Sequence, residues 1–416
     1  MNDNIKKSFF WNTLGSGLSS CNSLLFLVVV TRINGLINAG IFTLSYASAC
    51  MFYVIATYSG RTYQVTETDS ELNDSDFVFH RIISSIIMLI ISILFGIINK
   101  YANTKMLVFV LLCILKSIEA ICDVFHGIIQ KNNRLDIVGK SLFLRSVLNI
   151  ILFLVVDILT KSLILSTISL IVIDVIVLLL IDFRYSLKYK EKFTKFNYHA
   201  IYKIFSLGFF TFGFSFIANY LVNAPRYAID SIMSEEYQTI FGIIVMPATI
   251  IMLINQFIIQ PLITTLKNDY SDKDKKSFIT LIIKIIIVTI TTGLISIICA
   301  YFLGIPVLNM LYGIKLNNYL YSLLSILLGA TLYTIANVLS NSLIILRKTK
   351  IQLILYIITS IFAFLISYKL VNLFGFNGAI YSYVLIMSML LILYIIYFII
   401  VVNKKNIWED KNERKN

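Results

Sequence analysis

Residues 162–182 read SLILSTISLIVIDVIVLLLID, an apolar run in which Asp174 is the only charged residue before the final Asp182. An α-helix needs about 20 apolar residues to cross the hydrocarbon core of a bilayer. Stretches of this kind recur along the whole chain of 416 residues, of which 58% are hydrophobic and only 14% are charged. Soluble domains carry about a quarter charged residues. The composition therefore predicts an all-α integral membrane protein and argues against a soluble fold.

Twelve such stretches can be distinguished, and we expect each to form a transmembrane helix. They cover residues 9–31, 38–60, 80–99, 106–129, 138–158, 162–182, 204–224, 239–266, 277–303, 318–345, 351–370 and 377–402. Cytoplasmic connections carry an excess of basic residues, which fixes the orientation. With the N-terminus inside, the outer connections hold few of the 35 basic residues, namely Arg32, Lys100, Lys105, Lys161, Arg226, Lys315 and Lys369. Both termini are therefore predicted to be cytoplasmic.

A basic connection divides the predicted helices into two sets of six. We expect an N-terminal lobe at residues 1–183, a cytoplasmic linker at 184–203, a C-terminal lobe at 204–402 and a charged cytoplasmic tail at 403–416. The same inside-out order in both halves predicts parallel repeats, related by an axis along the membrane normal. The net charge of +13 is explained by these connections and by contacts with phospholipids, so it does not indicate a nucleic-acid partner.

The predicted helix at 106–129 carries three charged residues on one face: Lys116, Glu119 and Asp123. Gln130 continues this face, because the spacings of three, four and seven residues follow the helical period. Each charge facing lipid would cost about 2.5–3.5 kcal/mol, so the face must meet protein or a wet cavity. Two interpretations remain open. Lys116 forms a structural ion pair with one of the acids, which leaves the other acid over, or the face lines a transport path.

Further charged residues lie inside or at the ends of the predicted helices. Arg145 either reaches toward the membrane surface or presents a fixed cation to a cavity. Asp174 is either a hydrogen-bonded packing residue or a protonatable site. Asp157 and Asp182 lie at span ends, and we expect them only at the membrane interface.

Amide side chains form polar stripes on two more predicted helices. Span seven ends with Asn219, Asn223 and Arg226, where Pro225 should interrupt the helix, and span ten carries Thr334, Asn337 and Asn341 on one face. Such groups suit sugar hydroxyls, and they equally suit hydrogen bonds between helices. Their repetition favours a polar central cleft. The sequence contains no nucleotide-binding loop and no metal-ligand spacing of His and Cys, so we expect no cofactor, no metal and no enzymatic site.

Four segments carry a resemblance to a known family. They are residues 7–32 with WNT at 11–13 and the following NAGIF at 38–42, GRTYQVTE at 60–67, residues 127–140 with RLD at 134–136, and NAPRY at 223–227. Over essentially its whole length the sequence resembles the polysaccharide flippases of the multidrug/oligosaccharidyl-lipid/polysaccharide exporter superfamily. The resemblance implies a V-shaped fold of two six-helix bundles that works by alternating access in the bacterial cytoplasmic membrane.

The resemblance also implies a substrate, a polyprenyl-diphosphate-linked oligosaccharide repeat unit that is moved to the outer face for capsule or O-antigen-type polysaccharide. A polysaccharide polymerase and glycosyltransferases would be its partners. Candidate substrate-binding residues are then Lys116, Arg145, Arg226, Asn219, Asn223, Asn337 and Asn341. Candidates for coupling to a proton or sodium ion are Glu119, Asp123 and Asp174.

Three alternative functions remain. A related transporter could be a cation-coupled multidrug exporter or a flippase for a lipid-linked peptidoglycan precursor, although the GRTYQVTE segment and a net positive cavity argue against a drug exporter. A membrane polysaccharide polymerase or ligase is a second alternative, but such enzymes usually place a large catalytic loop outside, and the outer connections here are short. A scaffold for other glycan-assembly proteins is the third.

Overall fold

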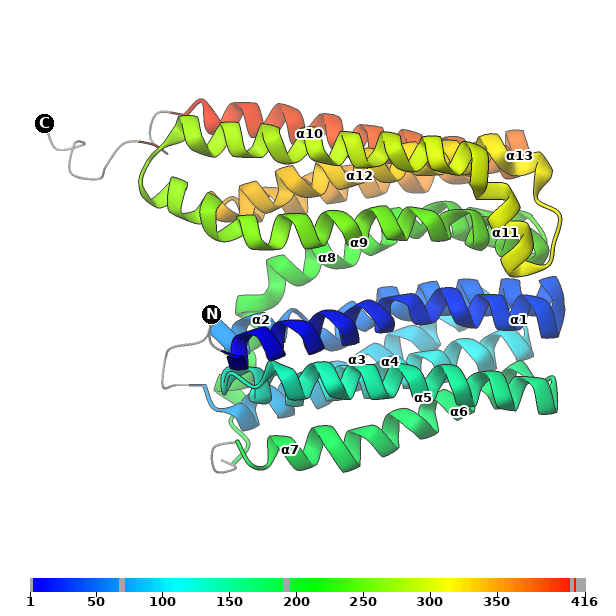
Figure 1. The fold of residues 1–416 in the computed structure, drawn as a ribbon, viewed down its shortest axis with the longest axis horizontal. Helices are drawn as coiled ribbons and strands as arrows, with labels where there is room; N and C mark the ends of the chain where they lie inside the picture. Colours follow the sequence, from blue (N-terminus) through cyan, green and yellow to red (C-terminus); the bar gives the residue numbers. More distant parts are fainter. Residues whose placement is uncertain (1–2, 67–71, 190–194, 405–407, 409–416) are drawn as a thin grey trace, which may run out of the picture. The chain divides into compact units, whose positions relative to one another are not determined.

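The computed structural model describes residues 3–66, 72–189, 195–404 and 408, and the regular structure in these ranges is helical. The α-helices are α1 (Asp3–Thr57), α2 (Gly60–Thr66), α3 (Asp74–Ile98), α4 (Asn103–Lys131), α5 (Leu135–Thr160), α6 (Leu163–Val177), α7 (Arg184–Ser186), α8 (Tyr198–Ile232), α9 (Glu235–Ser271), α10 (Lys275–Cys299), α11 (Ile305–Tyr312), α12 (Leu320–Ile345) and α13 (Thr349–Val402) (Figure 1). Two π-helical segments, Leu178–Phe183 and Ala300–Gly304, continue α6 into α7 and α10 into α11. A 3-10 turn, Asn317–Tyr319, precedes α12. Glu67, part of the linker 184–203 and most of the tail 403–416 lie outside the described residues.

The long helices of the described ranges overlap the predicted spans, with two spans each in α1 and α13, whereas the short helices α2, α7 and α11 correspond to no predicted span. Nine of the described helices are long and apolar enough to cross a membrane. Two of these nine, α1 and α13, are each long enough for two spans and are interrupted by a glycine in a non-helical conformation, Gly35 (φ 79°, ψ 178°) and Gly375 (φ 56°, ψ −134°). Helix α4 has 29 residues, but its charged side chains keep it out of the nine. With α4 added and α1 and α13 each divided, twelve membrane-length segments result.

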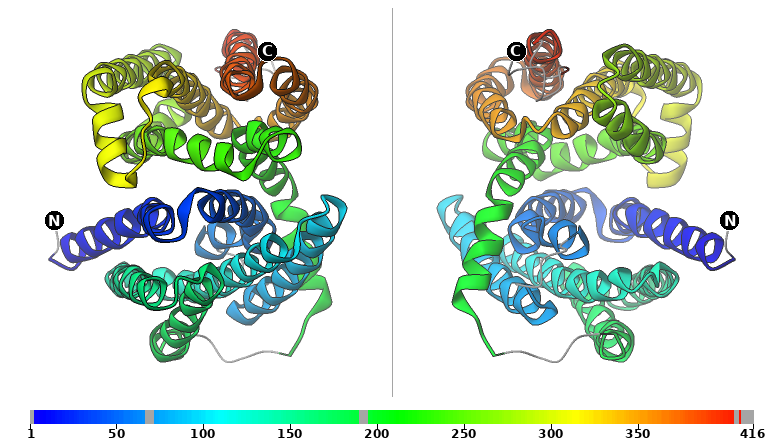
Figure 2. Two further views of the ribbon diagram at one scale, coloured as in Figure 1. Left: turned by 90° about the vertical axis from the view of Figure 1, so that its right-hand side faces the viewer. Right: turned by 90° about the vertical axis from the view of Figure 1, so that its left-hand side faces the viewer.

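The chain divides into two compact units, residues 1–219 and 220–416, and the division falls within α8. In the first unit, α1 packs against α3, α4 and α5, and α4 also contacts α6. In the second unit, α12 packs against α9, α10 and α13. Figure 2 shows the helices of each unit nearly end on. The lobe boundaries and the parallel repeat drawn from the sequence stay predictions.

Helix α8 differs from its prediction at its C-terminal end. The expected interruption at Pro225 is wrong, because the proline lies inside a helix that continues to Ile232. Neighbouring helices can compensate a proline in a membrane helix by satisfying the backbone group that it frees.

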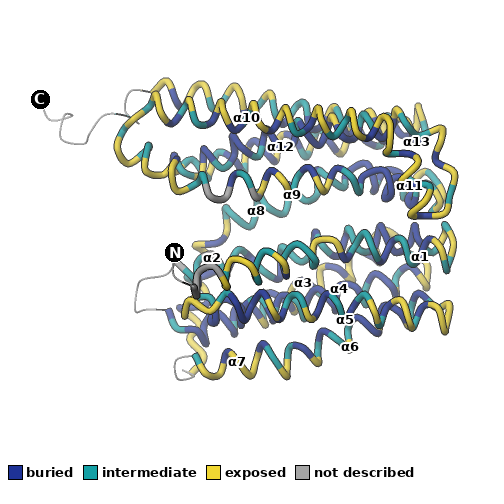
Figure 3. Tube along the Cα trace, in the orientation of Figure 1, coloured by how far each residue is buried: buried dark blue, intermediate teal, exposed yellow. Residues whose placement is uncertain are grey.

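The outward faces of the helices are apolar. Figure 3 shows rows of exposed positions along α10 and α13, and on α10 they include Ile283, Ile287, Leu294 and Ile298. Apolar surface this continuous is rare on soluble proteins and is what a bilayer requires. By contrast α12 lies in the interior of its unit, where 67% of the residues in its most apolar stretch are buried. The buried polar and charged side chains of the helices therefore lie behind apolar surfaces that can face lipid.

Candidate functional site

Helix α4 gathers the three predicted charges and gives Lys116 a partner on its own helix. Lys116 is 6% exposed, and its Nζ donates to both carboxylate oxygens of Glu119 at 2.9 and 2.8 Å. The same amine donates to the hydroxyl of Tyr46 at 3.3 Å and lies 4.8 Å from the centroid of that ring. Of the two acids that the sequence offered to Lys116, the structure selects Glu119.

Asp123, the remaining acid, accepts hydrogen bonds from two arginines outside α4. Arg61 Nη1 of α2 lies 2.9 Å from Oδ1, and Arg81 Nη2 of α3 lies 3.0 Å from Oδ2. Arg61 also donates to Gln130 Oε1 through Nε at 3.0 Å and Nη2 at 2.8 Å. Gln64 Nε2 donates to a backbone carbonyl of α4 at 3.1 Å. The segment GRTYQVTE thus docks, through its described residues, onto the polar face of α4.

These arginine partners were not predicted from the sequence. Arg81 is 1% exposed inside α3, and Arg61 lies on α2. Asp123, the acid left without a partner on its own helix, indicated such a partner, because a carboxylate within a span needs a cation or hydrogen-bond donors from another element. Glu119 and Asp123 keep side-chain exposures of 26% and 17%, so this charged face is only partly covered.

A second network joins α5 to α6 and its π-helical continuation. The guanidinium of Arg145 donates through Nη2 to Asp182 Oδ2, and its Nε lies 3.8 Å from Asp174 Oδ1. Asp174 also accepts from Asn149 Nδ2 at 2.8 Å. Arg145 is 6% exposed, so it does not reach toward the membrane surface.

Two acids that were expected at the membrane interface are buried instead. Asp182 is fully buried and accepts from Ser141, and its Oδ1 lies 3.0 Å from His126 Nε2. Asp157 is likewise fully buried, and Asn34 donates to it at 2.7 Å. The interfacial assignment failed because a position at the end of a hydrophobic stretch can still face neighbouring helices. For Asp182, the π-helical segment Leu178–Phe183 sets the direction of the side chain.

Only taken together do the two charged networks carry no net charge. The α4 network has three cations, Lys116, Arg61 and Arg81, for two carboxylates, whereas the second network has two carboxylates, Asp174 and Asp182, for Arg145. Pairing of this kind offsets the cost of removing charges from water. These networks therefore give no support to the argument against a drug exporter that rested on a net positive cavity.

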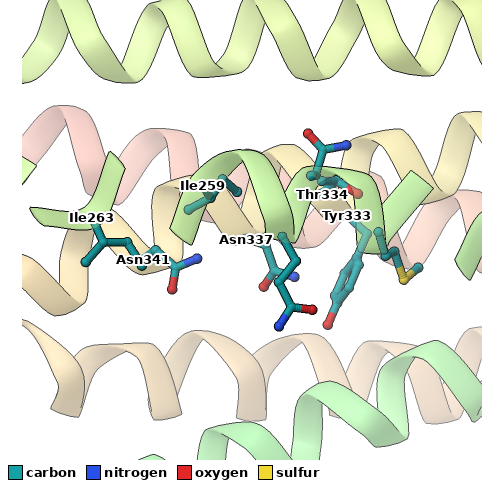
Figure 4. Close-up of a pocket in the computed structure, with 9 residues that line it drawn as sticks. Ile259, Ile263, Tyr333, Thr334, Asn337 and Asn341 are labelled. Atoms are coloured by element: carbon teal, nitrogen blue, oxygen red, sulfur yellow. The ribbon is translucent and has the colours of Figure 1, made fainter. Parts of the chain in front are cut away.

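In the second unit, α9 and α12 enclose a polar pocket of about 420 Å³ (Figure 4). Its lining residues are Met252, Asn255, Gln256, Ile259, Ile263, Tyr333, Thr334, Asn337 and Asn341. The predicted polar face of α12, with Thr334, Asn337 and Asn341, is confirmed as one wall of this pocket.

The opposite wall of the pocket was not predicted from the sequence. Asn255 and Gln256 are adjacent polar residues in the apolar stretch IIMLINQFII at residues 250–259, and such a pair inside a predicted span indicates a polar position. Asn255 is 1% exposed, and its Oδ1 accepts from Thr289 of α10 at 2.7 Å. Asn255 is thus fixed by helix packing, whereas the amides of α12 present polar groups to the pocket.

The stripe predicted at the end of span seven lies on α8. Asn219 Nδ2 donates to the backbone carbonyl one turn earlier at 3.0 Å. Arg226 is 5% exposed, and its guanidinium carbon lies 5.4 Å from the centroid of the Phe241 ring. Neither Asn223 nor Arg226 is among the residues that line the α9–α12 pocket.

Known proteins share the fold and, at a distance, the sequence. No family model matches the chain. It is 25% identical to the capsular polysaccharide biosynthesis protein CapF of Staphylococcus aureus over 370 residues, which cover 86% of this chain and 91% of CapF.

Solved structures of MATE transporters superpose on the chain over nearly its full length. A mutant of the Vibrio cholerae MATE transporter VcmN gives a TM-score of 0.67 at 10% identity, covering 98% of both chains. An inward-facing multidrug resistance MATE family transporter of the MOP superfamily gives 0.67 at 13% identity, covering 94% of both chains. Identities this low establish the fold alone. The chain is therefore an all-helical, multi-pass membrane protein with the fold of the MATE transporters, and it is distantly related to CapF.

Proposed function

We propose that this chain is a flippase that moves a polyprenyl-diphosphate-linked oligosaccharide repeat unit from the cytoplasmic to the outer face of a bacterial cytoplasmic membrane. The product would supply capsule or an O-antigen-type polysaccharide. The observation that carries the proposal is the likeness to CapF, which spans most of both chains and has capsular polysaccharide biosynthesis in its name. The MATE fold supports a transporter that acts by alternating access of two helix bundles.

The chemistry of such a substrate fits the polar groups found within each unit. A diphosphate–sugar headgroup cannot cross hydrocarbon unaided, whereas its polyprenyl tail can remain in the lipid. The transporter therefore needs polar groups for the headgroup behind surfaces that are apolar toward the membrane. The amide-lined pocket between α9 and α12 offers donors and acceptors that suit sugar hydroxyls.

We assign roles to the candidate residues on this basis. Asn337 and Asn341 bind sugar in the α9–α12 pocket, and Asn219 and Asn223 of α8 are further candidates for sugar binding. The candidate cations for the diphosphate are Lys116 and Arg145 in the first unit and Arg226 in the second. Glu119, Asp123 and Asp174 exchange a proton or sodium ion, which rearranges the ion pairs that now hold Lys116, Arg61, Arg81 and Arg145. Glycosyltransferases act on the same lipid-linked unit before transport, and a polysaccharide polymerase acts on it afterwards.

Reconstitution into liposomes tests the proposal. A fluorescent lipid-linked oligosaccharide in the inner leaflet should become accessible to an external lectin only when the protein is present. Asn337→Ala should lower the initial rate about tenfold, because loss of one hydrogen bond to a substrate costs roughly 1.4 kcal/mol. Asn268→Ala changes an exposed asparagine of the same unit and is the control, which should transport the lipid at the normal rate.

Lys116→Gln should also slow transport, without loss of membrane insertion.

A multidrug exporter is the second candidate, because the MATE fold fits it as well and the two charged networks together carry no net charge. The same liposomes distinguish the two. Uptake of a fluorescent organic cation without movement of the lipid-linked oligosaccharide would reject the flippase. If only a lipid-linked peptidoglycan precursor were moved, the protein would still be a flippase, but the proposed substrate would be wrong.

A further inference from the structure

A basic pocket of about 570 Å³ lies at one end of the first unit, where α1 and α5 begin and α6 passes into α7 (left-hand end in Figure 1). Its wall carries Lys7, Arg134, Lys140, Arg184 and Lys188. The acid among its lining residues is Asp136, and both of its oxygens accept from Arg134, at 2.9 and 3.1 Å. Within the part of the chain that the structure describes, the other four cations have no carboxylate within 4.0 Å. Among the described residues, the pocket therefore has an excess of positive charge.

Close packing of α1 on α5 builds one side of this pocket. A Cβ at Gly139 would collide with the backbone of Trp11, so a glycine is needed for the helices to approach this closely. The neighbouring Lys140 then has its Nζ 5.4 Å from the centroid of the Trp11 ring. Trp11 is held in turn by Phe143, with ring centroids 6.0 Å apart. Lys140 is thus positioned by a rigid aromatic contact.

Aromatic and apolar groups place the pocket at the level where lipid headgroups meet acyl chains. Lys188 Nζ lies 5.0 Å from the centroid of the Tyr185 ring. Tryptophan, tyrosine and lysine together are typical of the membrane interface. Next to these groups the pocket is lined by Leu144 and Leu180, whose side chains are exposed. One cavity therefore offers cations to an anion and apolar surface to a hydrocarbon chain.

We propose that this pocket binds the phosphate headgroup of an anionic membrane phospholipid. Lys140, Arg184 and Lys188 surround the phosphate, and an acyl chain follows the exposed leucines of α5 and α6. Basic pockets between membrane helices on the cytoplasmic side bind such headgroups, and this is the end that the distribution of lysines and arginines predicts to be cytoplasmic. The lipid links α1, α5 and α7 at a place separate from the charged face of α4. The proposal holds whatever substrate is transported.

Energy transfer from Trp11 provides the test, because the chain has only two tryptophans. With Trp408→Phe in the full chain, Trp11 is the single donor, and it lies beside the pocket. Dansyl-labelled phosphatidylglycerol, added to the delipidated protein in neutral detergent, should quench Trp11 saturably, and unlabelled phosphatidylglycerol should displace it. Phosphatidylcholine should not. Arg184→Gln with Lys188→Gln leaves the Lys140–Trp11 contact intact and should weaken binding about tenfold or more, because each cation contributes about 1 kcal/mol.

A control variant that loses the same number of cations outside the pocket tests whether the effect is specific to the pocket. Lys195→Gln with Lys276→Gln removes two exposed cations outside the pocket and should bind the labelled lipid as the unaltered protein does. Equal quenching by phosphatidylglycerol and phosphatidylcholine, or equal loss in both double variants, would overturn the proposal. Displacement by inorganic phosphate or farnesyl diphosphate, but not by phosphatidylglycerol, would replace the phospholipid with a different phosphate ligand and would equally reject it.

Discussion

At the scale of single residues, the first unit depends on charges that are paired across helices. Asp123 accepts from Arg61 and from Arg81, and the latter is 1% exposed. Arg81 also donates to the backbone carbonyl of Ala56 at 3.1 Å, which fixes its orientation. Because arginine keeps its charge, the carboxylate of Asp123 is what makes its burial tolerable.

Asp123→Ala should therefore destabilise the protein strongly. Removing one partner of a buried ion pair costs about 3–5 kcal/mol, because the other charge stays buried without compensation. The apparent melting temperature of the purified protein in detergent measures this loss. Asp272→Ala, at the exposed end of α9, is the comparison and should change stability by no more than about 0.5 kcal/mol. Equal shifts for the two variants would show that the Asp123 pairs contribute nothing.

At the scale of the elements, two glycines determine how the longest helices are divided. Gly35 has φ 79° and ψ 178°, a region open essentially to glycine alone, and it separates two spans of α1. Nothing lies within 4 Å of a Cβ built at Gly35 or at Gly17 of the same helix. The two positions therefore differ in backbone conformation and not in available space.

Gly35→Ala should cost about 1–3 kcal/mol, because alanine must adopt a strained backbone there. Gly17→Ala should be neutral or stabilising by up to about 1 kcal/mol, since alanine is the better helix former. Thermal unfolding of both variants in one detergent compares them directly. If Gly35→Ala melts with the unaltered protein or above it, the interruption of α1 does not depend on glycine.

At the scale of the whole molecule, the distribution of basic residues predicts which connections face the cytoplasm. In a variant without the five native cysteines, Lys161→Cys and Lys315→Cys should react in intact cells with a maleimide that cannot cross membranes. Lys195→Cys should react only after the membrane is permeabilised. The reverse pattern would invert the orientation, and it would also move the proposed phospholipid pocket to the outer face.

The sequence by itself located the apolar membrane segments, although not all of their limits, because α3 begins at Asp74 and α8 continues to Ile232. Each span satisfies its own backbone hydrogen bonds, so about 20 apolar residues suffice to define it without knowledge of its neighbours. For the same reason the polar face of α12 could be recognised from local spacing. Even α4, whose charges set it apart from the candidate spans, was located from its helical pattern.

Only the tertiary structure decided how the buried charges are paired. Arg61 and Arg81 lie 62 and 42 residues from Asp123 along the chain. They reach Asp123 only because α2 and α3 pack against α4. Asp182 lies at the end of a predicted span, but its carboxylate is in the π-helical segment and pairs with Arg145 of α5. Membrane insertion is decided segment by segment, whereas ion pairing depends on distances of a few ångströms between helices, which no single segment encodes.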